Sequence, residues 1–144
     1  MTTSIVALLG LMAATPAVPA CEPDRLVQSF YTLGLVEKQV RPAFERFVSA
    51  DFVEHKPDIA TANREGAIAF LETLVADLPD ARWEILRVAG DGELVAVHAR
   101  FTAADGAPAY AIADFFRVEG CLIREHWDVI SPPPVDAPNP LSRF

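Results

Sequence analysis

Asp114 is a carboxylate within an otherwise apolar stretch, and its setting suits acid/base chemistry. If residues 109–118 form a strand, side-chain alternation places Asp114 on a face with Tyr110, Ile112 and Phe116. Desolvation on such a face disfavours the charged carboxylate and prepares it for proton transfer. The same pattern also fits an aspartate that is paired with a neighbouring Arg or Tyr, or one on a solvated face.

Two histidines lie on the predicted neighbouring strands and are candidate catalytic partners of Asp114. His98 is on the preceding strand, where a one-residue change of register decides whether it shares the face of Asp114. His126 shares a face with Asp128, while Trp127 takes the opposite one. Either face could be interior, so either the His126–Asp128 pair or Trp127 could line a pocket.

The remaining histidine, His55, follows the second predicted helix in a loop, where binding residues often lie. An exposed loop histidine is an equal alternative. The three histidines are far apart in sequence and no HExxH motif is present, so we expect no metal site. Neither GxGxxG, a Walker A loop nor GxSxG occurs, which argues against nucleotide-binding enzymes and serine hydrolases.

Hydrophobic periodicity indicates helices first and strands afterwards. The period of 3.6 predicts helices over 24–36, 42–50 and 63–78, with Asn63 as the cap of the third. A period of 2 then predicts strands over 82–89, 93–102, 109–118 and 122–130. Residues 52–57 leave the helical pattern before Pro57. Short turns favour an antiparallel meander, so we expect an α+β fold with a curved antiparallel sheet on three helices and one internal pocket.

Composition sets the class of partner. The chain has 144 residues, 51% of them hydrophobic and 22% charged, which predicts one domain with a packed core. Its net charge is −8 and it has no basic block, so nucleic acid and anionic membranes are poor partners. The proline-rich segment 131–144 is expected to extend along the surface of that domain, which covers 21–144.

Residues 1–20 resemble a secretory signal, with an apolar run over 5–14 and small residues before Cys21. This predicts export, to the periplasm or the medium, with a lipid anchor at Cys21 as a further option. A mis-assigned start codon would instead leave a cytoplasmic protein with an apolar arm. After export, Cys21 and Cys121 could pair in a disulfide, or they could remain two free thiols.

Several short segments resemble the SnoaL-like group of the nuclear transport factor 2-like superfamily. The segment DFFRVEG at 114–120 followed by EHWDVI at 125–130 is the most characteristic part. Supporting segments are FERFV at 44–48, FVEHKP at 52–57 and LVAVH at 94–98. The resemblance covers roughly residues 24–144 and implies a cone-shaped α+β barrel with one deep apolar pocket, often dimeric through its sheet.

The resemblance also implies a reaction type. Named members of this group are polyketide cyclases, which close a ring by intramolecular aldol condensation with an aspartate as acid/base and without metal or organic cofactor. Asp114 matches the position of that aspartate. The turn at 103–108 is shorter than in typical cyclases, which argues against a bulky polyketide substrate.

Two hypotheses from different classes follow. The first is a cofactor-free acid/base enzyme for a small apolar carbonyl compound, in which Asp114 takes a proton and His55, His98 or His126 polarises the oxygen or returns the proton. The second is an exported pocket module that binds a lipophilic small molecule without turnover. In both cases we expect Tyr110, Phe116, Trp127, Asp128 and His55 to contribute to the pocket.

Overall fold

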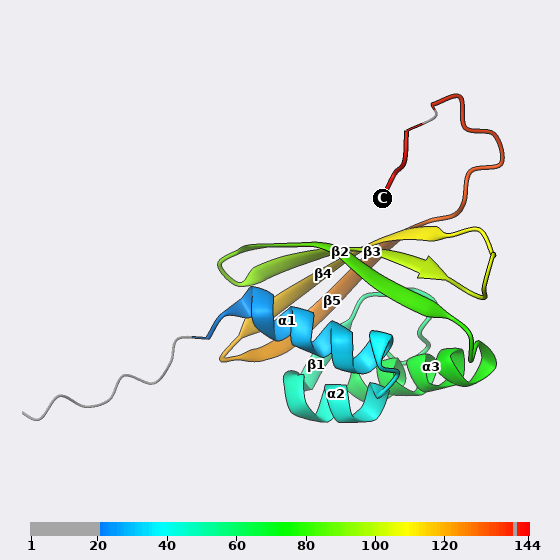
Figure 1. Ribbon diagram of the computed structural model, residues 1–144. Coiled ribbons are helices and arrows are strands. Elements are labelled where there is room, and N and C mark those ends of the chain that lie inside the picture. Colours follow the sequence, from blue (N-terminus) through cyan, green and yellow to red (C-terminus); the bar gives the residue numbers. More distant parts are fainter. Residues whose placement is uncertain (1–20, 140) are drawn as a thin grey trace, which may run out of the picture.

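The computed structural model describes residues 21–139 and 141–144. Three helical segments come first and the strands follow, with one strand placed between the second and third helices. In chain order the elements are α1 (Pro23–Tyr31), the π-helical turn η1 (Thr32–Val36), α2 (Val40–Phe47), β1 (Val48–Glu54), α3 (Arg64–Asp77), β2 (Arg82–Asp91), β3 (Leu94–Thr102), β4 (Tyr110–Glu119) and β5 (Leu122–Ser131). Figure 1 shows the helices together on one face of a twisted sheet. The predicted α+β class is confirmed.

The sheet has five strands in the order β1-β5-β4-β3-β2. Strands β2 to β5 form the predicted antiparallel meander. The fifth strand, β1, was not predicted, and it pairs in parallel with β5, so the sheet is mixed rather than purely antiparallel. The segment 48–54 follows α2 without a turn and ends just before Pro57, and in so short a run the alternation of buried Phe52 and Glu54 is a weak signal.

The helices begin and end for local reasons. Pro23 lies in the first turn of α1, where its missing N–H costs no hydrogen bond. The predicted helix over 24–36 corresponds to α1 continued by η1. Gly34 of η1 is buried against α2, and a Cβ added at Gly34 would lie only 3.1 Å from the Cβ of Ala43, so the glycine allows the two segments to approach closely. The Asn63 side chain accepts a hydrogen bond from the backbone N–H of Gly66 at the start of α3, so the predicted cap is confirmed.

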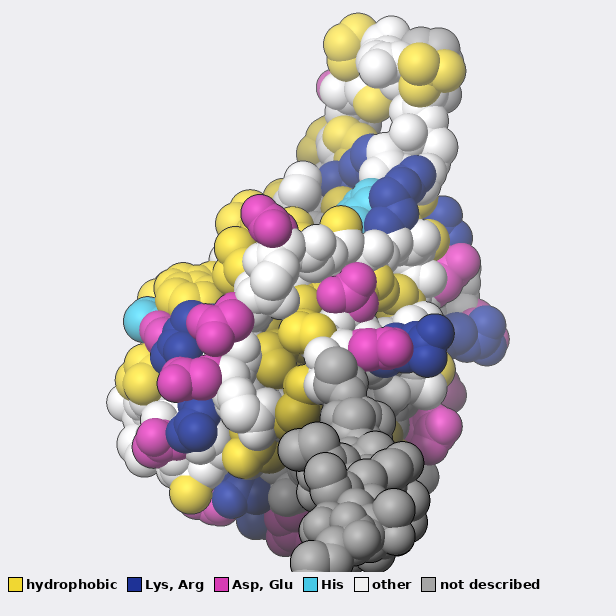
Figure 2. Space-filling view, turned by 90° about the vertical axis from the view of Figure 1, so that its left-hand side faces the viewer, with side chains coloured by type: hydrophobic (Ala, Val, Ile, Leu, Met, Phe, Trp, Pro, Cys, Tyr) yellow, Lys and Arg dark blue, Asp and Glu magenta, His cyan; other side chains and the backbone are white. Residues whose placement is uncertain are grey.

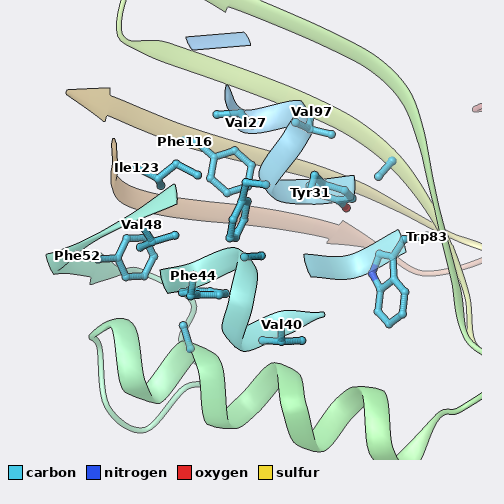
Figure 3. Close-up of a cluster of buried hydrophobic side chains, with 14 of the residues drawn as sticks. Val27, Tyr31, Val40, Phe44, Val48, Phe52, Trp83, Val97, Phe116 and Ile123 are labelled. Carbon is cyan, nitrogen blue, oxygen red and sulfur yellow. The ribbon is translucent and has the colours of Figure 1, made fainter. Parts of the chain in front are cut away.

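The core lies between the helices and the concave face of the sheet. Figure 3 shows Val27 and Tyr31 of α1, Phe44 of α2, Phe52 of β1 and Phe116 of β4 gathered in this layer. Edge-to-face contacts join Phe30 to Phe44 and to Phe116, with ring centroids 5.2 and 5.8 Å apart. Burial of these rings fixes the helices on the sheet and shapes the space beside them.

The C-terminal segment extends away from the sheet and folds back onto it (Figure 1). Arg143 donates hydrogen bonds to the carbonyl oxygens of Ala109 (2.6 Å) and Pro132 (2.8 Å), which ties the segment to the start of β4. The guanidinium of Arg100 lies 4.3 Å from the ring centroid of Phe144. On the face shown in Figure 2, acidic and basic side chains are interspersed.

The predicted signal sequence, residues 1–20, lies outside the described residues. Within 21–139 and 141–144, no helix combines the length and apolar character needed to cross a membrane. Cys21 and Cys121 are both free thiols. A hydrogen bond between them raises the pKa of Cys21 to about 11, so the two side chains are neighbours.

Candidate functional site

A cavity of about 290 Å³ lies between the concave face of the sheet and the helices. Apolar side chains make up most of its wall. Among the described residues, nine aromatic rings line it: Phe30, Tyr31, Phe44, Phe52, Phe70, Trp83, Phe101, Tyr110 and Phe116. A volume of this size admits a small organic molecule rather than a polymer.

One part of the cavity wall carries a buried cluster of two carboxylates and an imidazole. His126 Nδ1 lies 2.9 Å from Glu54 Oε1, and His126 Nε2 lies 3.1 Å from Asp114 Oδ1. The side chains are 14%, 4% and 9% exposed for His126, Glu54 and Asp114. The imidazole is therefore held on both ring nitrogens, away from bulk water.

The sheet register brings this cluster together. Glu54 at the end of β1 pairs with His126 on β5, and His126 pairs with Phe116 on β4. Asp114, two residues before Phe116, occupies the same face of β4. Three strands thus each contribute one side chain, and the parallel pairing of β1 with β5 supplies the carboxylate on the far side of the histidine.

The two carboxylates keep the imidazole charged. Burial lowers the pKa of His126, but the hydrogen bonds and negative charges of Asp114 and Glu54 outweigh it and raise the pKa from 6.5 to about 9. At neutral pH both ring nitrogens therefore carry hydrogens, and each donates to a carboxylate. No N–H of this ring remains for a bound molecule.

Two buried polar atoms of the cavity residues lie beyond ordinary hydrogen-bond distance of any partner among the described residues. They are the Tyr31 hydroxyl oxygen and Asp114 Oδ2. Burial raises the pKa of Tyr31 well above its ordinary value, and the negative charge of Asp114 and the approach of the phenol O–H to that carboxylate raise it further. The phenol therefore keeps its hydrogen and lies close to the Asp114 carboxylate. Buried polar atoms that make no hydrogen bond of ordinary length are costly unless a ligand uses them.

A second charged group lies beside the first. Lys56 Nζ is 2.7 Å from Asp128 Oδ2 and 3.3 Å from Asp58 Oδ2, and the Lys56 backbone N–H donates to Glu54 Oε1 at 2.9 Å. Burial lowers the pKa of Lys56, but its bonds to Asp128 and Asp58 have the greater effect and raise it. The Lys56–Asp128 ion pair links the segment after β1 to strand β5 at the cavity wall.

Five of the residues singled out from the sequence line the cavity: Asp114, His126, Tyr110, Phe116 and Asp128. The alternation on β5 is thus resolved in favour of His126 and Asp128 as the interior face. Among the described residues, no cluster of three His, Cys, Asp or Glu side chains is arranged to hold a metal ion.

The structure does not bring His98 to this site. In the register, Asp114 pairs with Val97, and His98 pairs with Ala113 on the other face of the sheet. There Arg87 donates a hydrogen bond of 2.8 Å to His98 Nδ1. For His98 to assist Asp114 as expected, the pairing of β3 with β4 would have to be shifted by one residue from the observed register.

His55 and Trp127 also lie away from the cavity. Their rings stack on the outer face of the sheet, with centroids 4.6 Å apart and planes 7° from parallel. His55 Nε2 is 3.0 Å from Glu125 Oε2. Neither residue lines the cavity, so their expected part in the pocket is not found.

Three residues of the site were missed by the sequence analysis: Tyr31, Glu54 and Lys56. Glu54 carries the signal that pointed to Asp114, a carboxylate two residues from a buried Phe52, but only if β1 is recognised as a strand. Tyr31 lies on the apolar stripe of α1, where it is indistinguishable from a core aromatic.

A family model for the SnoaL-like domain matches residues 27–126, which include every member of the His126 cluster. The chain belongs to the SnoaL-like domain family. No curated protein matches the chain.

Solved structures share the fold of this SnoaL-like protein at low sequence identity. A loop-truncated variant of IdmH, a protein of Streptomyces antibioticus, is 19% identical with a TM-score of 0.64, covering 76% of this chain and 92% of that one. A SnoaL-like polyketide cyclase of Agrobacterium tumefaciens is 17% identical with a TM-score of 0.61, covering 74% and 88%. A cystatin-fold protein of Novosphingobium aromaticivorans is 16% identical with a TM-score of 0.63, covering 76% and 99%.

Proposed function

We propose that this SnoaL-like protein catalyses proton transfer at the carbon next to the carbonyl group of a small apolar compound, in an isomerase-like or aldol-cyclase reaction. The observation that carries the proposal is that Asp114 Oδ2 and the Tyr31 hydroxyl are buried in one cavity lining, where neither makes a hydrogen bond of ordinary length and the phenol lies close to the carboxylate. A carboxylate oxygen can accept the proton. A phenol can donate to the oxygen on which negative charge develops.

The reaction begins when Asp114 Oδ2 takes the proton from the α-carbon. The electron pair of that C–H bond forms the enolate double bond, and the carbonyl electrons move to oxygen, which the Tyr31 O–H stabilises. In an isomerisation, neutral Asp114 then returns the proton to another carbon. In an aldol cyclisation, the enolate carbon attacks a second carbonyl of the same molecule, and the new alkoxide takes the proton.

His126 and Glu54 act as positioning residues in this scheme. Since both nitrogens of His126 are bonded to carboxylates, His126 fixes Asp114 through Oδ1 and leaves Oδ2 for the substrate. Glu54 holds the imidazole from the other side. The polarising group is therefore Tyr31 rather than a histidine.

The family adds support to this choice of reaction. One structural neighbour of the same fold is described as a SnoaL-like polyketide cyclase. In this chain the cavity of about 290 Å³ favours a substrate smaller than a fused polyketide. The short turn at 103–108 also favours a smaller substrate.

The test is deuterium exchange into the methyl group of 2-acetonaphthone in D2O, followed by proton NMR, because it detects enolisation without knowledge of the natural substrate. We expect Asp114→Asn to slow exchange by about 10²–10⁴-fold, the usual value of a general base. His98→Gln, a change on the outer face, serves as the matched control and should exchange at the wild-type rate. Binding of the ketone without any exchange, surviving Asp114→Asn, would instead indicate the non-catalytic binding module.

We also propose that two copies pair through the outer face of the sheet. That face carries the stacked His55 and Trp127 rings, and two apolar residues remain on it 39% and 63% exposed, Val53 and Val129. Apolar side chains at such exposure are typical of an interface. Sedimentation equilibrium tests this pairing.

We propose further that residues 1–20 direct export and are removed before Cys21. The intact mass of protein recovered from a periplasmic extract decides between a chain that begins at Cys21, a lipid-modified form and the uncut chain. The cut chain is the expected result.

A further inference from the structure

The cavity wall carries more negative than positive charge. Its ionisable side chains, apart from the two tyrosines, are four acids, Glu54, Asp58, Asp114 and Asp128, and two bases, Lys56 and His126. With all six charged, the formal net charge is −2. In a partly desolvated wall such charges act more strongly on a ligand than they would in water.

Both bases are already committed to acids. Lys56 contacts Asp128 at 2.7 Å and Asp58 at 3.3 Å, while His126 donates to Asp114 and Glu54. No arginine lines the cavity within the described part of the chain. An anionic ligand would therefore find no free cation, and it would have to displace a buried pair to obtain one.

The carboxylate of Asp114 also disfavours binding of an anion. Asp114 lines the cavity, and its Oδ2 makes no hydrogen bond of ordinary length that would offset its negative charge toward a ligand carboxylate. Like charges at close range in a desolvated site disfavour binding. A ketone or ester lacks that charge and can accept a hydrogen bond from Tyr31.

We propose that this cavity discriminates by charge, binding small uncharged carbonyl compounds and excluding the corresponding carboxylates. That the bound compound is a substrate rests on the proposed function above: it would be a ketone, aldehyde or ester and not a keto acid. The discrimination itself is a property of binding and requires no turnover.

The experiment compares two molecules of similar shape, 2-acetonaphthone and 2-naphthoate, by NMR titration of the ¹⁵N-labelled chain at pH 7. We expect the ketone to bind at least about tenfold more tightly. Equal affinity, tighter binding of naphthoate, or no binding of either molecule in the millimolar range would overturn the proposal.

Asp128→Asn tests the cause of the discrimination. It removes the closest acid of Lys56 and leaves the ammonium paired only with Asp58 at 3.3 Å, so naphthoate affinity should rise about tenfold relative to ketone affinity. Glu125→Gln is the matched control, since it removes one negative charge from the same strand on the outer face, and it should leave both affinities unchanged. Unchanged discrimination in Asp128→Asn would contradict the assignment.

Lys56→Met gives a second test that does not depend on the folding of Asp128→Asn. It removes the cation, so naphthoate should bind no better than to the wild type. Tighter naphthoate binding in this variant would overturn the proposal. All of these experiments measure binding. If the cavity discriminates by charge but no deuterium exchange occurs, the proposed catalytic function is refuted and the charge discrimination is not.

Discussion

Protonation of His126 should make the stability of this protein depend on pH above neutrality. The folded protein holds the imidazole proton between Asp114 and Glu54 with a pKa of about 9, against 6.5 in an ordinary environment. Because the folded state binds this proton more tightly, protonation stabilises folding. The contribution is complete below about pH 6.5 and is lost as the pH rises through about 9.

The magnitude follows from the difference in pKa. A shift from 6.5 to about 9 corresponds to about 3 kcal/mol, at about 1.4 kcal/mol for each pH unit. The His126 side chain is only 14% exposed, so solvent screens this interaction weakly. Urea unfolding at pH 6, 8 and 10 measures it, with His126→Gln as the reference that lacks the titrating group.

The free energy of unfolding of the wild type relative to His126→Gln should fall by about 3 kcal/mol between pH 6 and pH 10. Groups that titrate in both proteins cancel in this difference. Glu54→Gln should lower the midpoint of the His126 NMR titration, since it removes one of the two carboxylates. A wild-type midpoint at or below 6.5, or a stability difference independent of pH, would show that the carboxylates do not hold the proton.

Three further predictions concern the scaffold. Asn63→Ala removes the cap of α3 and should lower the free energy of unfolding by about 1 kcal/mol in urea, with Thr73→Ala on the same helix as the control. Oxidation should join the neighbouring Cys21 and Cys121, leave no thiol reactive to Ellman's reagent and stabilise the fold by up to about 4 kcal/mol; two persistently reactive thiols would contradict it. Trp127→Asp on the outer face should shift sedimentation from dimer to monomer, and an unchanged mass would exclude that interface.

The elements with strong periodicity were predictable from the sequence. The helix over 63–78 and the four strands after residue 80 were found within a few residues, because each has a clear apolar face and a turn signal beside it. β1 was not found, since it is short, follows α2 directly and pairs in parallel with a strand about 70 residues later. No local signal in the sequence specifies such a distant partner.

The candidate site was predictable only in part, for the same reason. Asp114 stood out as a carboxylate among apolar residues, and the structure places it in the cavity wall. The choice among three histidines depended on strand register and on which face of β5 is interior, which sequence alternation leaves open. Glu54 was not identified because its strand, β1, was not predicted, and Tyr31 was not identified because its position on α1 matches that of a core aromatic residue.

In the proposed mechanism Tyr31 and Asp114 together move a proton, and a double-mutant cycle on 2-acetonaphthone exchange tests this cooperation most directly. Tyr31→Phe should slow exchange by about 10²-fold and Asp114→Asn by about 10²–10⁴-fold. If the two act as one unit, the double variant should be little slower than Asp114→Asn alone. Wild-type exchange rates in both single variants, with the folded NMR spectrum retained, would contradict the claim.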